Sequence, residues 1–281
     1  MVKLRHLSAL LIVVAASRAA PQATAQGGTL TPVRESGQSV TPAFEGWYKN
    51  ADGTYSLSFG YFNRNASEVL EIPIGPANSF SPGTPDRGQP AHFEPRRHWG
   101  VFAVTVPADF KVGDKVVWTL AIRSDTFRIP GHIRPNWQID ALEGEAGSGN
   151  TPPVIKFEEN GKPGAGPGGL TAAQKLTTKV GTAVELKAWV TDDGKTRGSV
   201  AGGGRGVATL RWFKHTGPGE VTFTNPAPRP TGAGGMAATT ALFSAPGEYV
   251  VRLRANDGSV VSSGHSQCCW SNGFVRVSVT P

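Results

Sequence analysis

The stretch GEYVVRLRANDG at residues 247–258 decides the fold, because apolar and polar side chains alternate along it. Tyr249, Val251, Leu253 and Ala255 fall on one side of an extended chain, and Glu248, Arg252 and Arg254 fall on the other. Successive side chains of a strand point to opposite faces, so this period of two is typical of a half-buried β-strand. The closing Asn-Asp-Gly indicates a turn. We therefore predict a strand with one face in a hydrophobic core.

Six further segments of the second half show the features of short strands. They lie at residues 152–157, 182–191, 208–215, 220–225, 238–245 and 273–281. With 247–258 they make a series of seven strands separated by turn residues, which predicts an immunoglobulin-like β-sandwich. In the strand at 208–215, Leu210 and Trp212 are expected to face its core.

Two stretches of this half carry a family resemblance. LRWFKHTGPGEVTFTNP (210–226) and TTALFSAPGEYVVRLRANDGS (239–259), followed by a valine-rich end, resemble PKD-type and related immunoglobulin-like modules of bacterial exported proteins. The resemblance implies a non-catalytic scaffold or recognition module, although a fold alone does not settle function. The long loop before the last strand departs from the pattern. The matching positions are Trp212, Gly217, Val221, Phe223, Phe243, Gly247, Tyr249, Leu253, Ala255, Asp257 and Gly258.

The first half predicts a second β-sandwich. Alternating segments lie at 54–62, 68–75, 100–107 and 115–123, and we expect a last strand at 136–142. In 115–123, Val116, Trp118, Leu120 and Ile122 form one inward row. The proline- and glycine-rich segment 75–99 is expected to be irregular, and so long a loop in a compact domain is often functional.

Three motifs of this half resemble a recurrent module of bacterial surface and secreted proteins. They are FGYFNRN (59–65), IPIGPANSFSP (72–82) and DRGQPAHFEPRR (86–97). The resemblance spans residues 40–141 and implies a location rather than an activity.

The beginning of the chain predicts export. Lys3, Arg5 and His6 precede an apolar run at 7–16, and the small residues ATA at 23–25 fit a signal-peptidase site. The run is too short for a membrane span, which needs about 20 apolar residues. We expect a bacterial protein exported to the periplasm or the outside.

The expected organisation follows from these segments. It is a signal peptide at 1–25, a β-sandwich domain at 26–142, a linker of small polar residues at 143–150 and the PKD- or immunoglobulin-like domain at 151–281. The fold class is therefore all-β, with two β-sandwich domains in tandem.

The basic charge does not predict a nucleic-acid partner. The formal charge is +7, but Lys3, Arg5 and Arg18 lie in the predicted signal peptide, and the other basic residues are spread along the chain. Nucleic-acid surfaces usually gather basic and aromatic residues into one stripe. Spread charge of this kind mainly favours solubility.

Catalytic motifs are not evident in the sequence. There is no G-x-S-x-G nucleophile motif, and GHS at 264–266 is not one. We therefore expect neither an enzyme nor a cofactor.

Metal-binding motifs are equally weak. His92, His98, His132, His215 and His265 lack the spacing of a structural zinc site. The aspartates have two readings that both stay open: they hold calcium at one end of the second sandwich, or they simply form turns. These residues are Asp192, Asp193 and Asp257.

Several aromatic residues are candidates for sugar binding. Trp189 is out of phase with Leu186, Ala188 and Val190, so its ring should face away from that core. The other candidates are Trp47, Tyr48, Trp99 and Trp137. These rings either bind carbohydrate or cover sheet edges and domain contacts, since isolated surface aromatics are common.

The two cysteines, Cys268 and Cys269, are neighbours in the loop that we expect at 259–272. Three readings are open: a vicinal disulfide within the chain, free thiols that bind a soft metal with His265, or a bridge to another chain. Export favours oxidation, so we predict the vicinal disulfide.

In an immunoglobulin-like topology this loop shares one end of the sandwich with the loop at 192–206. Arg197, Arg205, His265, the cysteines and Trp270 are then expected to form a recognition tip, with Trp270 presented to a partner.

The sequence thus predicts a secreted, non-enzymatic protein of binding, adhesion or surface assembly. Its expected partner is a protein or a polysaccharide at the cell surface. The alternative is a carbohydrate-binding accessory protein that uses exposed aromatics such as Trp189 and Trp99.

Overall fold

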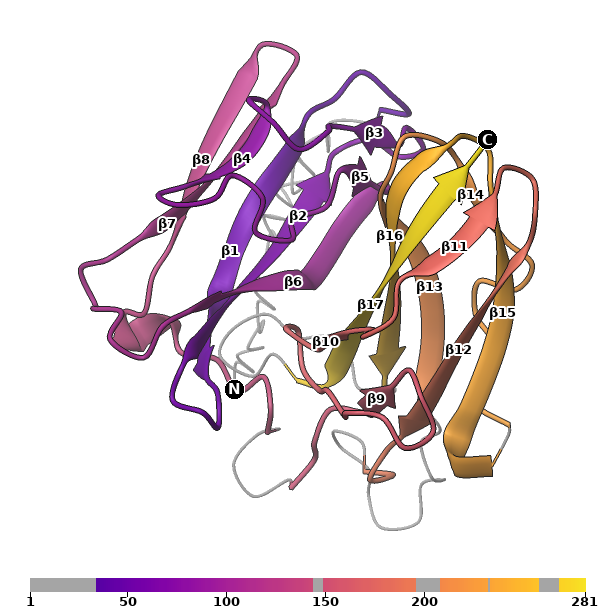
Figure 1. Ribbon diagram of the computed structural model, residues 1–281. Helices are drawn as coiled ribbons and strands as arrows, with labels where there is room; N and C mark the ends of the chain where they lie inside the picture. The colour runs from indigo at the N-terminus through magenta and orange to yellow at the C-terminus, as the bar shows by residue number, and fades with distance from the viewer. Residues whose placement is uncertain (1–33, 144–148, 196–207, 232, 258–267) are drawn as a thin grey trace, which may run out of the picture. The chain divides into compact units, whose positions relative to one another are not determined.

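The computed structural model describes residues 34–143, 149–195, 208–231, 233–257 and 268–281 (Figure 1). Residues 33–281 belong to one compact unit. None of the helical segments described is long and apolar enough to cross a membrane. The predicted signal peptide and most of the predicted linker lie outside the described residues.

The first half contains two three-stranded sheets and a short strand pair. The sheets have the orders β1-β2-β6 and β4-β7-β8, all antiparallel, and β3 pairs with β5. The strands are β1 (Val40–Lys49), β2 (Tyr55–Asn63), β3 (Leu70–Glu71), β4 (Asn78–Ser81), β5 (His92–Phe93), β6 (Arg96–Val106), β7 (Val116–Ile122) and β8 (Asp125–Gly131).

Aromatic rings fill the core of this half. Phe59 of β2 stacks on Phe102 of β6 with ring centres 5.5 Å apart, and the edge of Trp118 on β7 meets Phe102 at 5.2 Å. All three side chains are almost fully buried. The predicted inward row is confirmed for Val116, Trp118 and Leu120, because each is buried, while Ile122 packs at the margin.

Two expectations for this half were wrong. Segment 75–99 contains β4, β5 and the start of β6. The prediction missed β4 and β5 because strands of two to four residues are too short to show an alternating pattern in the sequence. Residues 136–142 are not a strand. A short 3-10 turn at Pro135–Trp137 replaces its start, since proline suits the first position of a helical turn. The last strand of this half is β8, and neither β8 nor β1 was predicted.

The second half contains two facing sheets. Their orders are β14-β15-β12-β9 and β10-β17-β16-β13, with β11 also paired to β17. This grouping is typical of immunoglobulin-like sandwiches, so the predicted all-β fold with an immunoglobulin-like half is confirmed. The strands are β9 (Val154–Lys156), β10 (Leu170–Thr171), β11 (Leu176–Lys179), β12 (Val184–Thr191), β13 (Thr209–Thr216), β14 (Val221–Phe223), β15 (Met236–Phe243), β16 (Gly247–Asn256) and β17 (Trp270–Thr280).

Tyr249 fixes the corner where β16 begins. Its hydroxyl donates to the carbonyl of Ala245 at 2.8 Å and accepts from the backbone N–H of Gly219 at 2.9 Å. Gly217 passes so close that a Cβ there would clash with the tyrosine ring. A tyrosine near the start of this strand that bonds back to the preceding backbone is a hallmark of the immunoglobulin fold.

The last strand begins earlier than predicted. β17 starts at Trp270, which pairs with Asn256, so Trp270, Ser271 and Asn272 belong to the strand and not to the loop. All three side chains are fully buried. The start of this strand was missed because Ser271 and Asn272 are polar and both are buried. The sequence there shows no alternation of apolar and polar residues.

A buried junction around Gly100 joins the two halves. Trp270 is 0% exposed, and its indole N–H donates to the carbonyl of Gly100 at 3.2 Å. The side-chain amide of Asn272 donates to the same carbonyl at 2.6 Å. Arg252 of β16 donates to the carbonyl of Val101 at 3.3 Å. Strands β16 and β17 therefore hold β6 through its backbone.

The other side of Gly100 is held by a buried carboxylate. The N–H of Gly100 donates to Glu45 at 2.5 Å, and Arg97 donates to the same carboxylate at 2.7 Å. Burial raises the pKa of Glu45 to about 7, although Arg97 and the Gly100 N–H act to lower it. Gly100 thereby links β1, β6 and β17.

We predict that Gly100→Ala lowers the melting temperature by several degrees. Gly100 has φ 45° and its Cβ would clash with the Trp270 indole. Overpacking costs about 1–3 kcal/mol, and about 1 kcal/mol corresponds to ~2–4 °C in a chain of this size. Gly181→Ala is the control, because Gly181 has φ 71° and open space around it. Equal melting temperatures for the two variants would contradict the role given to the Trp270 contact.

Candidate functional site: the cleft between the sandwiches

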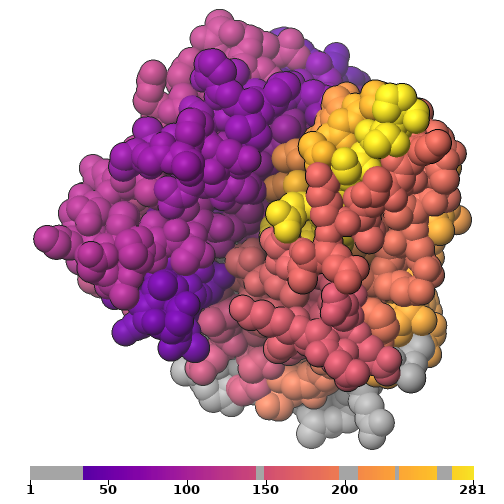
Figure 2. Space-filling view, in the orientation of Figure 1, coloured from indigo at the N-terminus to yellow at the C-terminus, as the bar shows by residue number. Residues whose placement is uncertain are grey.

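A cleft of about 300 Å³ opens where the two halves meet. Figure 2 shows the purple first half meeting the salmon and yellow strands of the second half along a groove. One wall comes from the loop Asp86–Gln89 and from Phe102 and Ala103 of β6. The opposite wall comes from β10, β13, β16 and β17, so both sandwiches build the site.

The cleft has an apolar floor and a charged rim. Its apolar lining includes the half-buried Phe274 of β17 and Ala103 of β6, whereas the ring of Phe102 is buried in the core of the first half. Arg87, from the first half, donates to the carbonyl of Thr105 at 3.3 Å, and Arg276 of β17 is exposed on the opposite wall. Asp86 accepts from the N–H of Gly88 at 2.9 Å, which leaves the rim with two arginines and one carboxylate.

His215 closes the inner end of the cleft. It is 3% exposed, its Nε2 lies 2.9 Å from the carbonyl of Gly88, and its own carbonyl accepts from the N–H of Ala91. Burial, and then the nearby Arg252, lower the pKa of His215 to about 3. The ring is therefore neutral near pH 7, and Nε2–H donates to Gly88.

The histidine of the cleft is not suited to act as a general base near neutral pH. A general base should titrate near the working pH, and His215 titrates far below it. Among the cleft residues that the structure describes, no serine or cysteine forms a hydrogen-bonded pair with a histidine. Guanidinium groups above an apolar floor can instead hold an acidic or amphipathic ligand.

The structure describes only the cysteines and Trp270 of the predicted recognition tip. Arg197, Arg205 and His265 lie outside the described residues. Trp270 is fully buried in the junction, so the expectation that it presents its ring to a partner was wrong. Its indole has a partner inside the chain, Gly100, and cannot stack on a ligand at the surface.

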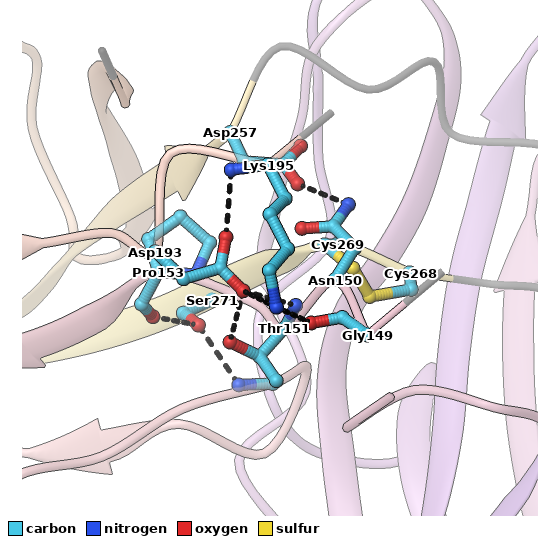
Figure 3. Close-up of a disulfide and its surroundings, with 11 residues drawn as sticks. Gly149, Asn150, Thr151, Pro153, Asp193, Lys195, Asp257, Cys268, Cys269 and Ser271 are labelled. Atoms are coloured by element: carbon cyan, nitrogen blue, oxygen red, sulfur yellow. Dashed lines mark hydrogen bonds and ion pairs between the residues drawn. A yellow bond between two sulfur atoms is a disulfide. The ribbon is translucent and has the colours of Figure 1, made fainter. Parts of the chain in front are cut away.

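The cysteines form an intramolecular disulfide, as the sequence suggested (Figure 3). Cys268 is 6% exposed and Cys269 is 1% exposed, so the bond lies under the surface. Beside it the N–H of Asp257 donates to the carbonyl of Cys269 at 3.4 Å, and Asn150 donates to the Asp257 carboxylate at 2.8 Å. The disulfide thus belongs to the packed base of β16 and β17.

Of the three candidate aspartates, Asp192 and Asp193 accept from backbone N–H groups two residues on, as turn formers do, whereas Asp257 accepts from Asn150. Asp193 accepts from the N–H and hydroxyl of Thr151, both at 3.1 Å, and from the N–H of Lys195 at 2.8 Å (Figure 3). Asp192 accepts from the N–H of Gly194 at 3.0 Å. The parts of the chain that the structure describes contain no group of three or more His, Cys, Asp or Glu side chains placed for a metal ion.

The candidate aromatic residues have different environments. Trp47 and Tyr48 are buried, and the Arg97 guanidinium covers the half-buried Trp99 ring at 3.8 Å. Trp137 is 41% exposed and stacks on Phe44 at 5.4 Å. Trp189 is half-buried, opposite the buried Leu186, Ala188 and Val190, so its predicted orientation is confirmed.

The arginines of the cleft carry no recognisable signal in the sequence. Arg87 lies in a segment interpreted as irregular, and Arg276 is one polar position in an alternating strand. Neither position differs locally from an ordinary solvent-exposed base. Only the approach of β17 to the loop at 86–89 places both arginines around one cleft.

Comparisons with known proteins add little. No protein-family model and no curated protein matches the chain. Solved structures similar to 85% of this chain include the D0-D1 domain of intimin (12% identity, 97% of that chain, TM-score 0.26) and its D00-D0 domain (13%, 98%, 0.26). Domains 4 and 5 of the S-layer protein SbsC match 87% of this chain and 98% of that chain at 11% identity, with a TM-score of 0.23. Such low TM-scores carry no functional argument.

We predict that His215 makes folding stability sensitive to acid. Its pKa falls from 6.5 to about 3 on folding, so the unfolded chain binds the proton more readily. The contribution is full above pH 6.5 and is lost as the pH falls toward 3. The free energy of unfolding can be measured with denaturant between about pH 4 and 8, roughly the range where His titrates. It should fall less toward acid pH in His215→Gln than in the unaltered protein.

Glu45→Gln provides a control of opposite sign. The pKa of Glu45 rises from 4.5 to about 7, so its contribution is full below pH 4.5 and is lost as the pH rises toward 7. An unchanged acid dependence in His215→Gln would contradict the neutral, buried state assigned to this ring.

We also predict that the Cys268–Cys269 disulfide is present in the isolated exported protein. The sulfurs are buried, so the native monomer should take up no thiol label, whereas reduction in denaturant should expose two thiols. Intact mass with and without reduction measures this. Labelling of denatured, unreduced monomer, or a dimer that reduction splits, would contradict the prediction.

Proposed function

We propose that this chain is an exported, non-enzymatic binding protein of adhesion or surface assembly that holds its ligand in the cleft between its sandwiches. The observation that carries the proposal is the cleft itself, which is built from both halves beside a buried junction. Contacts between domains are frequent places for ligand sites. The PKD-type identity of the second half, the signal peptide and the boundary at 143–150 are parts of the same proposal.

The junction supports this function by fixing the two walls. Hydrogen bonds from Trp270 and Asn272 to Gly100, and from His215 to Gly88, connect one wall to the other. A site that is rigid before binding loses less conformational entropy when the ligand arrives. A fixed cleft also suits a protein that holds a partner without converting it chemically.

The lining supports an acidic partner at the cell surface. Arg87 and Arg276 approach from opposite walls, while the half-buried Phe274 offers apolar area in the lining. Arginine forks pair well with carboxylates and phosphates. A carboxylate-bearing polysaccharide or an acidic protein segment has this chemistry.

Carbohydrate binding through exposed aromatics is the second candidate. Trp137 favours it, because one ring face stacks on Phe44 and 41% of the residue is exposed. Trp189 is the corresponding candidate on the second half. Trp99 is less suitable, since Arg97 covers its ring.

The two candidates make different predictions for retention on immobilised acidic and neutral cell-surface polysaccharides and on an acidic protein. If the cleft binds, Arg276→Glu should weaken retention about tenfold or more, because it reverses one of the two positive charges on the rim. Arg128→Glu is the matched control, an exposed arginine on β8 outside the cleft lining. Retention that survives Arg276→Glu but is lost in Trp137→Ala or Trp189→Ala would favour the aromatic candidate.

A further inference from the structure

The strands β13 and β16 bring three arginines together on the face of the sheet that meets the first half. Arg211 and Arg254 are direct cross-strand partners, and Arg252 lies opposite Phe213. The guanidinium carbons of Arg211, Arg252 and Arg254 lie 5.3, 4.6 and 5.5 Å from the centre of the Phe213 ring. One phenyl ring therefore stands among three cations.

The three arginines have different roles. Arg252 is 3% exposed and donates to the Val101 carbonyl and to Asn272, so it belongs to the junction. Arg211 is exposed and Arg254 is half-buried. Within the described parts of the chain, neither of these two forms an ion pair or a side-chain hydrogen bond. Their donors remain open to an external group.

The arrangement is electrostatically unfavourable without an anion. Like charges that face each other across an antiparallel pair destabilise the sheet. Burial, and then Arg211, lower the pKa of Arg254. The facing groups of the first half are Glu94, Tyr61 and His98, and burial lowers the pKa of His98 to about 4, so this ring is neutral. Three cations against one carboxylate leave an excess of two positive charges.

We infer that Arg211 and Arg254 form a binding site for a phosphate-type dianion. One doubly charged group between the two guanidinium ions would balance this excess and turn their repulsion into a shared contact. Arginine presents forked donors that match phosphate oxygens. Phosphate at neutral pH carries a charge of about −1.5 to −2, which fits the excess.

The position of the site also favours a terminal phosphate group. β13 ends the sheet order β10-β17-β16-β13, so the pair opens at the sheet edge. The site is distinct from the cleft, because Arg276 pairs with Val250, four residues along β16 from Arg254, or ~13 Å at about 3.3 Å per residue. The inference therefore does not rest on the proposed function, and either can fail alone.

Thermal unfolding in sodium phosphate and in sodium chloride of equal ionic strength tests the site. Excess phosphate should raise the melting temperature of the mature protein by about 2 °C or more, since a ligand that binds only the folded state stabilises it. Arg211→Ala and Arg254→Ala should lose this rise. Arg128→Ala should keep it, because Arg128 is an exposed arginine on a different sheet.

Arg211→Glu gives the sharpest result. It places a carboxylate opposite Arg254, so it should raise the melting temperature in chloride and abolish the response to phosphate. Arg211 is exposed, and the variant should therefore fold. A phosphate response in Arg211→Glu or Arg211→Ala equal to that of the unaltered protein would overturn the inference, as would no response in the unaltered protein.

Two further experiments test whether the phosphate group belongs to a soluble monoester or to a lipid headgroup. Titration calorimetry with O-phosphoserine, a soluble phosphate monoester, should give binding that Arg211→Ala weakens at least about tenfold, as expected for a charge-assisted contact. Vesicles with phosphatidic acid, against phosphatidylcholine vesicles, test a lipid headgroup as the source. Binding of either phosphate form that depends on Arg211 supports the site, and binding that is indifferent to Arg211 and Arg254 contradicts it.

Discussion

The indole of Trp270 resting on Gly100 is the contact on which the rest of the molecule depends. Gly100 has no Cβ, so the ring can approach its backbone and donate to its carbonyl. The same carbonyl accepts from Asn272, and the N–H of Gly100 donates to Glu45. One glycine thus connects the first strand of the chain with the last strand, and the walls of the cleft follow from that connection.

The junction is polar, and this determines where charge is left over. Buried ion pairs contribute little net stability but can specify one arrangement, because a buried charge without its partner is costly. Glu45 with Arg97 fits this description beside the interface. Across the interface, Lys214, whose side chain is 5% exposed, pairs at 2.7 Å with Glu71, whose side chain is 42% exposed. The guanidinium of Arg252 is also used within the junction, where it donates to the Val101 carbonyl. The arginines at the ends of the same sheet face, Arg276 and the pair Arg211–Arg254, keep donors for external groups.

An immunoglobulin-like sandwich does not define an activity, so the function has to come from sites built on it. Here the outer face of one sheet serves as an interface and also carries the two sites that we propose. The cleft uses the end near Arg276, and the arginine pair uses the edge at β13. The disulfide lies under the surface at the end of β16 and the start of β17, where the N–H of Asp257 donates to the carbonyl of Cys269. A rigid support with recognition at its margins fits a binding protein.

The sequence by itself determined the strands whose one face is a core and whose other face is solvent. Leu253 and Trp118 could be placed in their cores because alternation reports that difference directly. It failed where the outer face is also buried, as at Trp270 and Asn272, and where strands are very short, as at Asn78–Ser81. Only the tertiary structure located the two proposed sites, because the residues that meet in each of them are far apart in the chain. Trp270 contacts a residue 170 positions away, and no local pattern of side chains records such an approach.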